Sequence, residues 1–145
     1  MKTYSFEKMV AWQRAKELNL MIYKVTKDFP KEEIFGLVAQ MKRVAISITS
    51  NLAEGSARKS DKDKARFYEI AYGSTIEILS QTIVSFELKF LTKENYELVR
   101  GLVDDVCFLI SQLRKPLVDS VADDEIEYGI TKLPPPPNPY DENPN

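Results

Sequence analysis

The chain has 145 residues, among them 20 basic and 22 acidic side chains, one cysteine and no histidine. A chain of this length fits one domain, which buries about 68% of the surface that the unfolded chain exposes and needs no disulfide or metal for stability. The absence of histidine excludes catalytic triads built on imidazole, zinc sites with histidine ligands and the Glu-x-x-His ligands of di-iron bundles. The single cysteine, Cys107, excludes a disulfide within the chain, and its apolar surroundings (VCFLI) predict a core position.

Neither the start of the chain nor any later segment predicts contact with a membrane. The first twelve residues, MKTYSFEKMVAW, lack the apolar stretch of a secretion signal. No later run approaches the roughly 20 apolar residues that cross a bilayer. We therefore expect a cytoplasmic protein.

Amphipathic patterns predict two helices in the first third of the chain. From Phe6 to Asp28, apolar residues recur in steps of three and four, which indicates a helix with one buried side that ends at Pro30. The next helix begins at the segment 31–33 (KEE), because acidic side chains suit the positive end of a helix dipole. Gly55 provides its stop signal.

Two more helices complete an all-α domain over residues 1–118. The third begins near Asp61, a suitable N-cap residue, and continues to Phe90. The fourth begins near Thr92 or Lys93 and ends in the segment 116–120, which opens with proline. Four long helices with short connections predict an antiparallel up-down four-helix bundle.

The third helix carries more apolar residues than one buried side needs. Its predicted core side is Tyr68, Tyr72, Leu79, Ile83, Phe86 and Phe90. The remaining apolar residues of this helix are Phe67, Ile70, Ala71, Ile76, Ile78, Val84 and Leu88. This surplus indicates burial against another subunit, and the alternative is a central helix in a monomeric bundle.

Residues 119–145 differ from the body of the chain. They contain seven acidic side chains and one basic side chain, whereas basic side chains outnumber acidic ones in residues 1–118. The stretch DDEIEYGITK could form a short strand, and LPPPPNPYDENPN, with six prolines, predicts a polyproline-like or disordered tail. Its role is either solubilising or the docking of a partner or a neighbouring subunit. The basic body suits a polyanion partner, although ordinary surface charge explains it equally well.

Polar side chains follow one side of the second helix. Arg43, Ser47, Ser50, Asn51 and Glu54 are spaced by threes and fours, next to the apolar side. Because buried polar groups need partners, we expect them to bond to a neighbouring helix or across a subunit boundary. The alternative is a surface that offers its arginines to phosphates.

Gly73 in the third helix predicts a notch. Glycine in a helix interior costs about 1 kcal/mol relative to alanine, so we expect another backbone to approach here, either the second helix near Asn51 or a helix of an adjacent subunit. Ser74 should then reach the polar side of the second helix. The predicted packing stripe is Arg43, Ser47, Asn51, Glu54, Gly55, Gly73 and Ser74.

A basic segment connects the second and third helices. Together with the free backbone N–H groups at the start of a helix, such a cluster can bind phosphates. The predicted nucleic-acid-binding residues are Lys42, Arg43, Arg58, Lys59, Lys62, Lys64 and Arg66. Asp61 and Asp63 dilute the positive charge, and a solvated connector is an equally good interpretation. No base-reading motif is present, so any contact should recognise backbone and shape.

Several blocks make the sequence similar to a known family. AWQRAKEL, IYKVTKDFP, GLVAQMKRVAISITSNLAEGSAR and FYEIAYGSTIEIL resemble the four-helix-bundle proteins encoded in intervening sequences of bacterial 23S ribosomal RNA genes, also called S23-like ribosomal proteins. The match covers residues 6–91 by motif and the fourth helix by pattern. It implies a homopentameric ring with nucleic-acid binding. More distantly, the chain is similar to the accessory variability determinant of diversity-generating retroelements, a basic pentamer that partners a reverse transcriptase and RNA.

The resemblance places family motifs on particular residues. The Arg-Arg pair of the family corresponds to Lys42-Arg43, and its Gly-Ser pair to Gly73-Ser74. The Asn-x-Ala-Glu-Gly block ends at Gly55. Thr49 stands where members usually have proline, which lets the second helix run without a kink. The acidic, proline-rich extension is not part of the family pattern.

Three functions follow from these features. The first is a non-enzymatic accessory protein that binds nucleic acid. In this function several copies of the chain assemble into one oligomer. The second is a protein-interaction scaffold, such as an accessory subunit of a reverse transcriptase. The third is a magnesium-dependent enzyme using Glu94, Glu97, Asp104 and Asp105, but ordinary exposed helix acids explain this grouping. We expect no enzyme activity, no cofactor or metal, and no small-molecule substrate.

Overall fold

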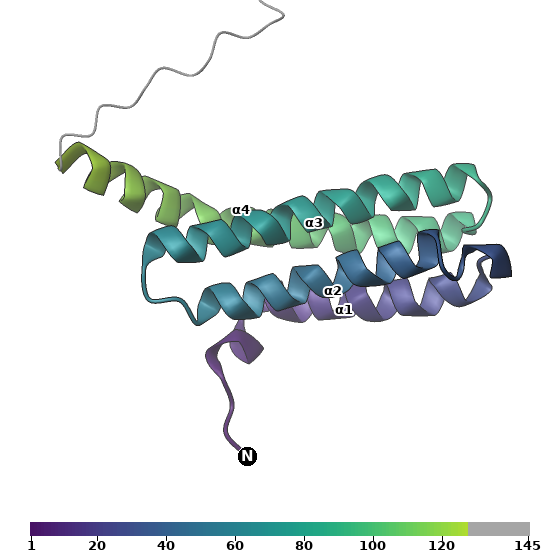
Figure 1. Cartoon of the computed structure of the whole chain (residues 1–145), viewed down its shortest axis with the longest axis horizontal. Helices are drawn as coiled ribbons and strands as arrows, with labels where there is room; N and C mark the ends of the chain where they lie inside the picture. Colours follow the sequence, from purple (N-terminus) through teal and green to yellow (C-terminus); the bar gives the residue numbers. More distant parts are fainter. Residues whose placement is uncertain (128–145) are drawn as a thin grey trace, which may run out of the picture.

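Four long helices lie side by side (Figure 1). The structure, a computed structural model, describes the backbone of residues 1–127 and the side chains of residues 1–120. The helices are α1 (Val10–Val25), α2 (Leu37–Ser56), α3 (Asp61–Glu87) and α4 (Lys93–Glu127). The described residues contain no strand, so the prediction of an all-α fold with four helices is confirmed.

The helices close around one apolar core. α2 and α4 both pack against α3, and α1 packs against α2 and α4. Figure 1 shows successive helices joined at opposite ends. Burying a large aliphatic side chain contributes about 1.5–3 kcal/mol, so these positions dominate the stability of the fold. The largest fully buried apolar side chains are Leu18, Ile22, Met41, Ile48, Leu52, Ile78, Val99, Val103, Val106 and Ile110.

The first two helices begin later than predicted. Residues Ser5–Lys8 form a 3-10 helix, Met9 is extended, and α1 begins at Val10. Residues Lys31–Glu33 form another 3-10 helix, and Gly36 leaves the helical path with φ −106° and ψ −112°. The carboxylate of Glu33 instead accepts a hydrogen bond of 3.2 Å from the Leu37 N–H, which satisfies a free donor at the start of α2.

The end of α2 also corrects a prediction. Gly55 does not stop the helix, which continues to Ser56. A Cβ atom at residue 55 would lie 2.9 Å from Cβ of Phe67 and even closer to the ring of Tyr68. Gly55 is therefore required by the close approach of α3.

The fourth helix is longer than predicted. Pro116 lies inside α4, which continues to Glu127, so residues 119–127 are helical and not extended. Proline removes one intrahelical hydrogen bond and kinks a helix, and such a helix can resume beyond it. In Figure 1 the last turns of α4 diverge from the neighbouring helices. The predicted polyproline-like segment lies outside the described residues.

Hydroxyl side chains occupy core positions of α3 that the apolar pattern does not predict. Thr75 and Thr82 are fully buried, and their hydroxyls donate to Ala71 O at 2.8 Å and Ile78 O at 2.7 Å. Bonding to the preceding turn satisfies the hydroxyl, which allows it to be buried. Ile83, predicted to be buried, is 38% exposed.

Among the residues that the structure describes, no helix is both long enough and apolar enough to span a membrane.

Candidate nucleic-acid interface

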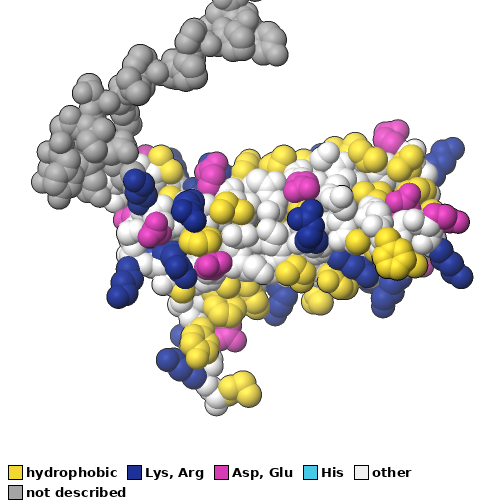
Figure 2. Space-filling view, in the orientation of Figure 1, with side chains coloured by type: hydrophobic (Ala, Val, Ile, Leu, Met, Phe, Trp, Pro, Cys, Tyr) yellow, Lys and Arg dark blue, Asp and Glu magenta, His cyan; other side chains and the backbone are white. Residues whose placement is uncertain are grey.

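The turn between α2 and α3 gathers five of the predicted binding residues at one end of the molecule. Ser60 starts α3 as its N-cap, and its hydroxyl accepts a hydrogen bond of 3.1 Å from the Asp63 N–H. Figure 2 shows several Lys and Arg side chains at this end of the α2 and α3 face, with Asp and Glu side chains among them. We call Arg58, Lys59, Lys62, Lys64 and Arg66 the turn cluster.

Two arginines of the turn cluster flank one aromatic ring. The guanidinium carbons of Arg58 and Arg66 lie 5.3 Å and 5.5 Å from the ring centroid of Phe67. Arg58 also donates from Nε to Glu54 O at 3.3 Å, and its terminal nitrogen lies 3.9 Å from the Glu54 carboxylate. A guanidinium has five N–H donors, so these contacts orient Arg58 and leave donors for a phosphate.

Lys42 and Arg43 are not part of this arrangement. Lys42 lies on the α1 side of α2, with its ammonium 4.8 Å from the ring centroid of Tyr23. Arg43 is exposed one turn before Ser47, on the side that faces α3. Arg58 follows Arg43 by 15 positions, a separation of about 22 Å along the direction of the helix. The structure therefore brings five of the seven predicted residues together and separates the other two.

Part of the predicted packing stripe joins α2 to α3 within the chain. The hydroxyls of Ser47 and Ser74 lie 3.0 Å apart. The Asn51 amide donates to the backbone oxygen and the hydroxyl of Ser47, at 2.7 Å and 3.0 Å. Gly73 is exposed and faces outwards, and a Cβ atom there would meet nothing within 4 Å. The expected approach of α2 to Gly73 is therefore wrong.

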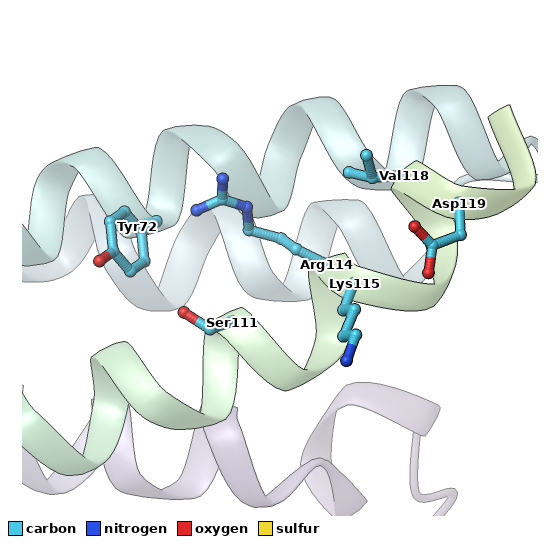
Figure 3. A pocket seen from close by; sticks show the side chains of 6 residues that line it. All are labelled: Tyr72, Ser111, Arg114, Lys115, Val118 and Asp119. Atoms are coloured by element: carbon cyan, nitrogen blue, oxygen red, sulfur yellow. The ribbon is translucent and has the colours of Figure 1, made fainter. Parts of the chain in front are cut away.

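A second basic site, which the sequence pattern does not predict, lies between α3 and α4. Arg114 pairs with Glu69 at 2.7 Å, and its guanidinium carbon lies 4.7 Å from the ring centroid of Tyr72. Arg114 and Tyr72 border a pocket of about 390 Å³ (Figure 3). The adjacent bases Arg114 and Lys115 are a visible signal in the sequence, but only the packing of α3 on α4 gives them these neighbours. The pocket is lined by Tyr72, Ser111, Arg114, Lys115, Val118 and Asp119.

The acidic residues of α4 that could have held magnesium, Glu94, Glu97, Asp104 and Asp105, do not form a metal site. Glu97 pairs with Lys93 at 3.8 Å, and Asp105 pairs with Arg14 at 3.1 Å. Within the described part of the chain, no three His, Cys, Asp or Glu residues are placed to hold a metal ion. Burial, followed by the nearby Asp104 carboxylate, raises the pKa of the Cys107 thiol. A raised pKa lowers the thiolate fraction, which makes Cys107 a poor nucleophile.

Comparisons with known proteins agree with this architecture. A protein-family model described as "23S rRNA-intervening sequence protein" matches residues 7–112. A crystal structure of a protein with unknown function from the S23 ribosomal protein family of Bacteroides thetaiotaomicron VPI-5482 superposes with a TM-score of 0.68. That protein is 21% identical, and the alignment covers 73% of this chain and 96% of the other. At this identity the likeness shows the fold alone.

No curated protein matches the chain. The family match is therefore the finding that identifies it, and it covers more than half of the residues, including α1, α2, α3 and most of α4. The chain belongs to the 23S rRNA-intervening sequence protein family.

Proposed function

We propose that this chain is a non-enzymatic accessory protein that binds the phosphate backbone of structured RNA or DNA through its turn cluster. The observation that supports this function best is the turn cluster itself, five bases around the end of α2 and the start of α3. Phosphate neutralisation by Lys and Arg dominates the affinity of such proteins and requires no base-specific contact.

The local structure favours a phosphate ligand in two ways. Arg58 is held by Glu54 and the ring of Phe67, so its guanidinium loses little freedom when it binds. The first N–H groups of α3 add positive partial charge at the same turn. Asp61 and Asp63 oppose an anion there, which predicts binding that is weak for each chain.

We also propose that the antiparallel up-down bundle is the protomer of a homo-oligomer, the pentameric ring that the family resemblance implies. The outer side of α3 supports this part, because Ile70, Val84 and Leu88 are 43%, 48% and 52% exposed. A second copy of the chain would cover these apolar side chains. Assembly would multiply the weak contacts of each turn cluster.

The binding function can be tested with a fluorescently labelled RNA hairpin and fluorescence anisotropy. Lys59→Gln removes an exposed base of the turn cluster, and Lys31→Gln removes an exposed base at the opposite end as the matched control. We expect Lys59→Gln to weaken binding and to lower the salt slope by about 0.9 for each duplex phosphate that the variant no longer neutralises, whereas Lys31→Gln should match the wild type. Wild-type protein that shows no salt-dependent binding to hairpin or duplex would refute the function.

A further inference from the structure

We propose that the pocket between α3 and α4 is a second phosphate subsite, which holds a phosphodiester of the same strand that contacts the turn cluster. This inference rests on the proposed nucleic-acid binding and assigns it a further site. The ligand class is a phosphodiester because the pocket combines two cationic side chains, Arg114 and Lys115, with the hydroxyls of Ser111 and Tyr72. Cations and hydroxyl donors are the groups that bind phosphate oxygens.

Contacts with Glu69 and Tyr72 fix the side chain of Arg114 at the pocket. Its side chain is 25% exposed, its terminal nitrogen pairs with Glu69 at 2.7 Å, and Tyr72 supports the face of the guanidinium. In Figure 3 the guanidinium extends towards Tyr72, while the ammonium of Lys115 extends away from it. The two charges therefore border different parts of the pocket. An arginine fixed in this way loses little conformational entropy when a ligand binds.

One donor of Arg114 lacks an acceptor. Its Nε atom is buried and has no hydrogen-bond partner among the described residues. Buried donors without partners are rare in folded proteins and require an explanation. The buried Nε shows how closely this part of Arg114 is packed, so an anion in the pocket would meet the terminal nitrogens of the guanidinium.

The pocket continues the surface of the turn cluster. Lys62 and Arg66 precede Glu69 by seven and three residues, so the three lie along one side of α3. The hydroxyl of Ser120 in α4 donates to the Asp61 carboxylate at 3.1 Å, which places this part of α4 beside the start of α3. From Lys62 to Glu69 the helix rises about 10 Å, which is about three nucleotides at ~3.4 Å each. One strand can therefore reach both sites.

Asp119 gives this proposal a distinctive test. Its carboxylate also lines the pocket and opposes an anion there. Asp119→Asn should therefore tighten binding of a labelled single strand, by about two- to fivefold. Asp104→Asn makes the same charge change at an exposed position of α4 outside the pocket, and it should leave the affinity unchanged. Loss of the fold is not expected to produce a gain of this size at Asp119 alone, and an unchanged circular dichroism spectrum checks that Asp119→Asn remains folded.

A second pair of variants tests occupancy of the pocket without changing charge. Ser111→Phe fills the pocket, and we expect it to weaken binding of the full-length protein to the strand and to lower the single-strand salt slope by about 0.7. Gln112→Phe places the same side chain at the next position of α4, which does not line the pocket, and should bind as the wild type does.

Inorganic phosphate and mononucleotides carry phosphate groups as a strand does, so they are the alternative ligands of the pocket. Adenosine monophosphate and inorganic phosphate are titrated against wild-type protein while the amide NMR signals of Ser111 and Tyr72 are followed. We expect the strand to shift these signals at concentrations where neither small molecule does. Equal shifts from the mononucleotide would overturn the assignment to a strand and make the pocket a free-nucleotide site.

The outcomes separate the two proposals. If wild-type protein binds neither the RNA hairpin nor the labelled single strand, both the proposed function and the subsite are refuted, whereas binding of the hairpin alone refutes only the subsite. If Lys59→Gln weakens binding but Asp119→Asn and Ser111→Phe match their controls, the turn cluster stands and the subsite is overturned. The subsite is supported when Asp119→Asn gains affinity and Ser111→Phe loses it.

Discussion

A Cβ atom on Gly55 would lie 2.7 Å from Cε1 of Tyr68, so α2 and α3 approach each other more closely here than any side chain at residue 55 allows. Tyr68 is 5% exposed, and burial raises the pKa of its phenol. The aromatic ring therefore fills the space next to the glycine. This contact fixes how α3 leaves the turn that carries the basic residues.

Replacing this glycine should destabilise the protein. Gly55→Ala forces the ring of Tyr68 or the backbone of α3 to move, and overpacking of this kind costs about 1–3 kcal/mol. The free energy of unfolding, measured in urea, should fall by that amount. An unchanged midpoint would show that α3 can shift freely at this position.

Gly73 provides the matched control in the same fold. A Cβ atom there meets nothing within 4 Å, and alanine is the better helix former by about 1 kcal/mol. Gly73→Ala should therefore raise the free energy of unfolding of the isolated chain. A loss of stability that depends on protein concentration would instead indicate that another copy packs against Gly73.

The contact between Asn19 of α1 and Thr49 of α2 predicts that substitutions at the two residues have coupled effects on stability. Asn19 is 7% exposed, and its side chain forms a hydrogen bond of 2.8 Å with the Thr49 hydroxyl. Thr49→Val leaves the buried amide short of a partner and should cost about 1–3 kcal/mol. In the double variant Asn19→Leu, Thr49→Val, much of this cost should be recovered. Additive effects in a double-mutant cycle would show that the bond contributes little.

The exposed apolar side of α3 predicts self-association. Light scattering of the wild type should give a mass above one chain, and Ile70→Glu should lower it, because a charge replaces an apolar contact. Leu20→Glu is the control, since Leu20 is 65% exposed in α1 and lies away from α3. A single-chain mass for the wild type at high concentration would contradict the oligomer.

Cys107 should react slowly in the folded protein. Burial raises the pKa of its thiol, so at a given pH the folded state holds less thiolate than the unfolded chain. Alkylation by iodoacetamide at pH 8 should be slower than in urea, and the folded rate should keep rising at higher pH. Equal rates in both states would mean that the thiol is freely accessible.

Periodicity is sufficient to predict the helices but not their contacts. Leu18 and Ile22 follow the pattern of a buried helix side, and both are fully buried. Hydropathy does not reveal Thr75 and Thr82 as core residues, because their burial depends on hydroxyl bonds to the preceding turn. The sequence pattern at Gly55 is that of a helix stop signal. The structure shows instead that glycine is required because the ring of Tyr68, 13 residues further along the chain, leaves no room for a side chain.

The sequence predicts only that part of the candidate site whose residues lie close together along the chain. The turn cluster falls within nine residues, so the sequence places its members together. Arg114 acquires its neighbours Glu69 and Tyr72 from another helix, and no spacing rule links them. Lys42 and Arg43 are adjacent in sequence, and the helix directs them to different sides, towards α1 and towards α3.

The most direct test of the proposed function is ultraviolet cross-linking of the full-length protein to an RNA hairpin, with the cross-linked peptides identified by mass spectrometry. Phe67 and Tyr72 lie beside the proposed contacts, whereas Phe35 is 97% exposed in the connection between α1 and α2 at the opposite end. We predict cross-links in the peptides that carry Phe67 and Tyr72. Cross-links confined to the Phe35 end, or no cross-links at low salt, would contradict it.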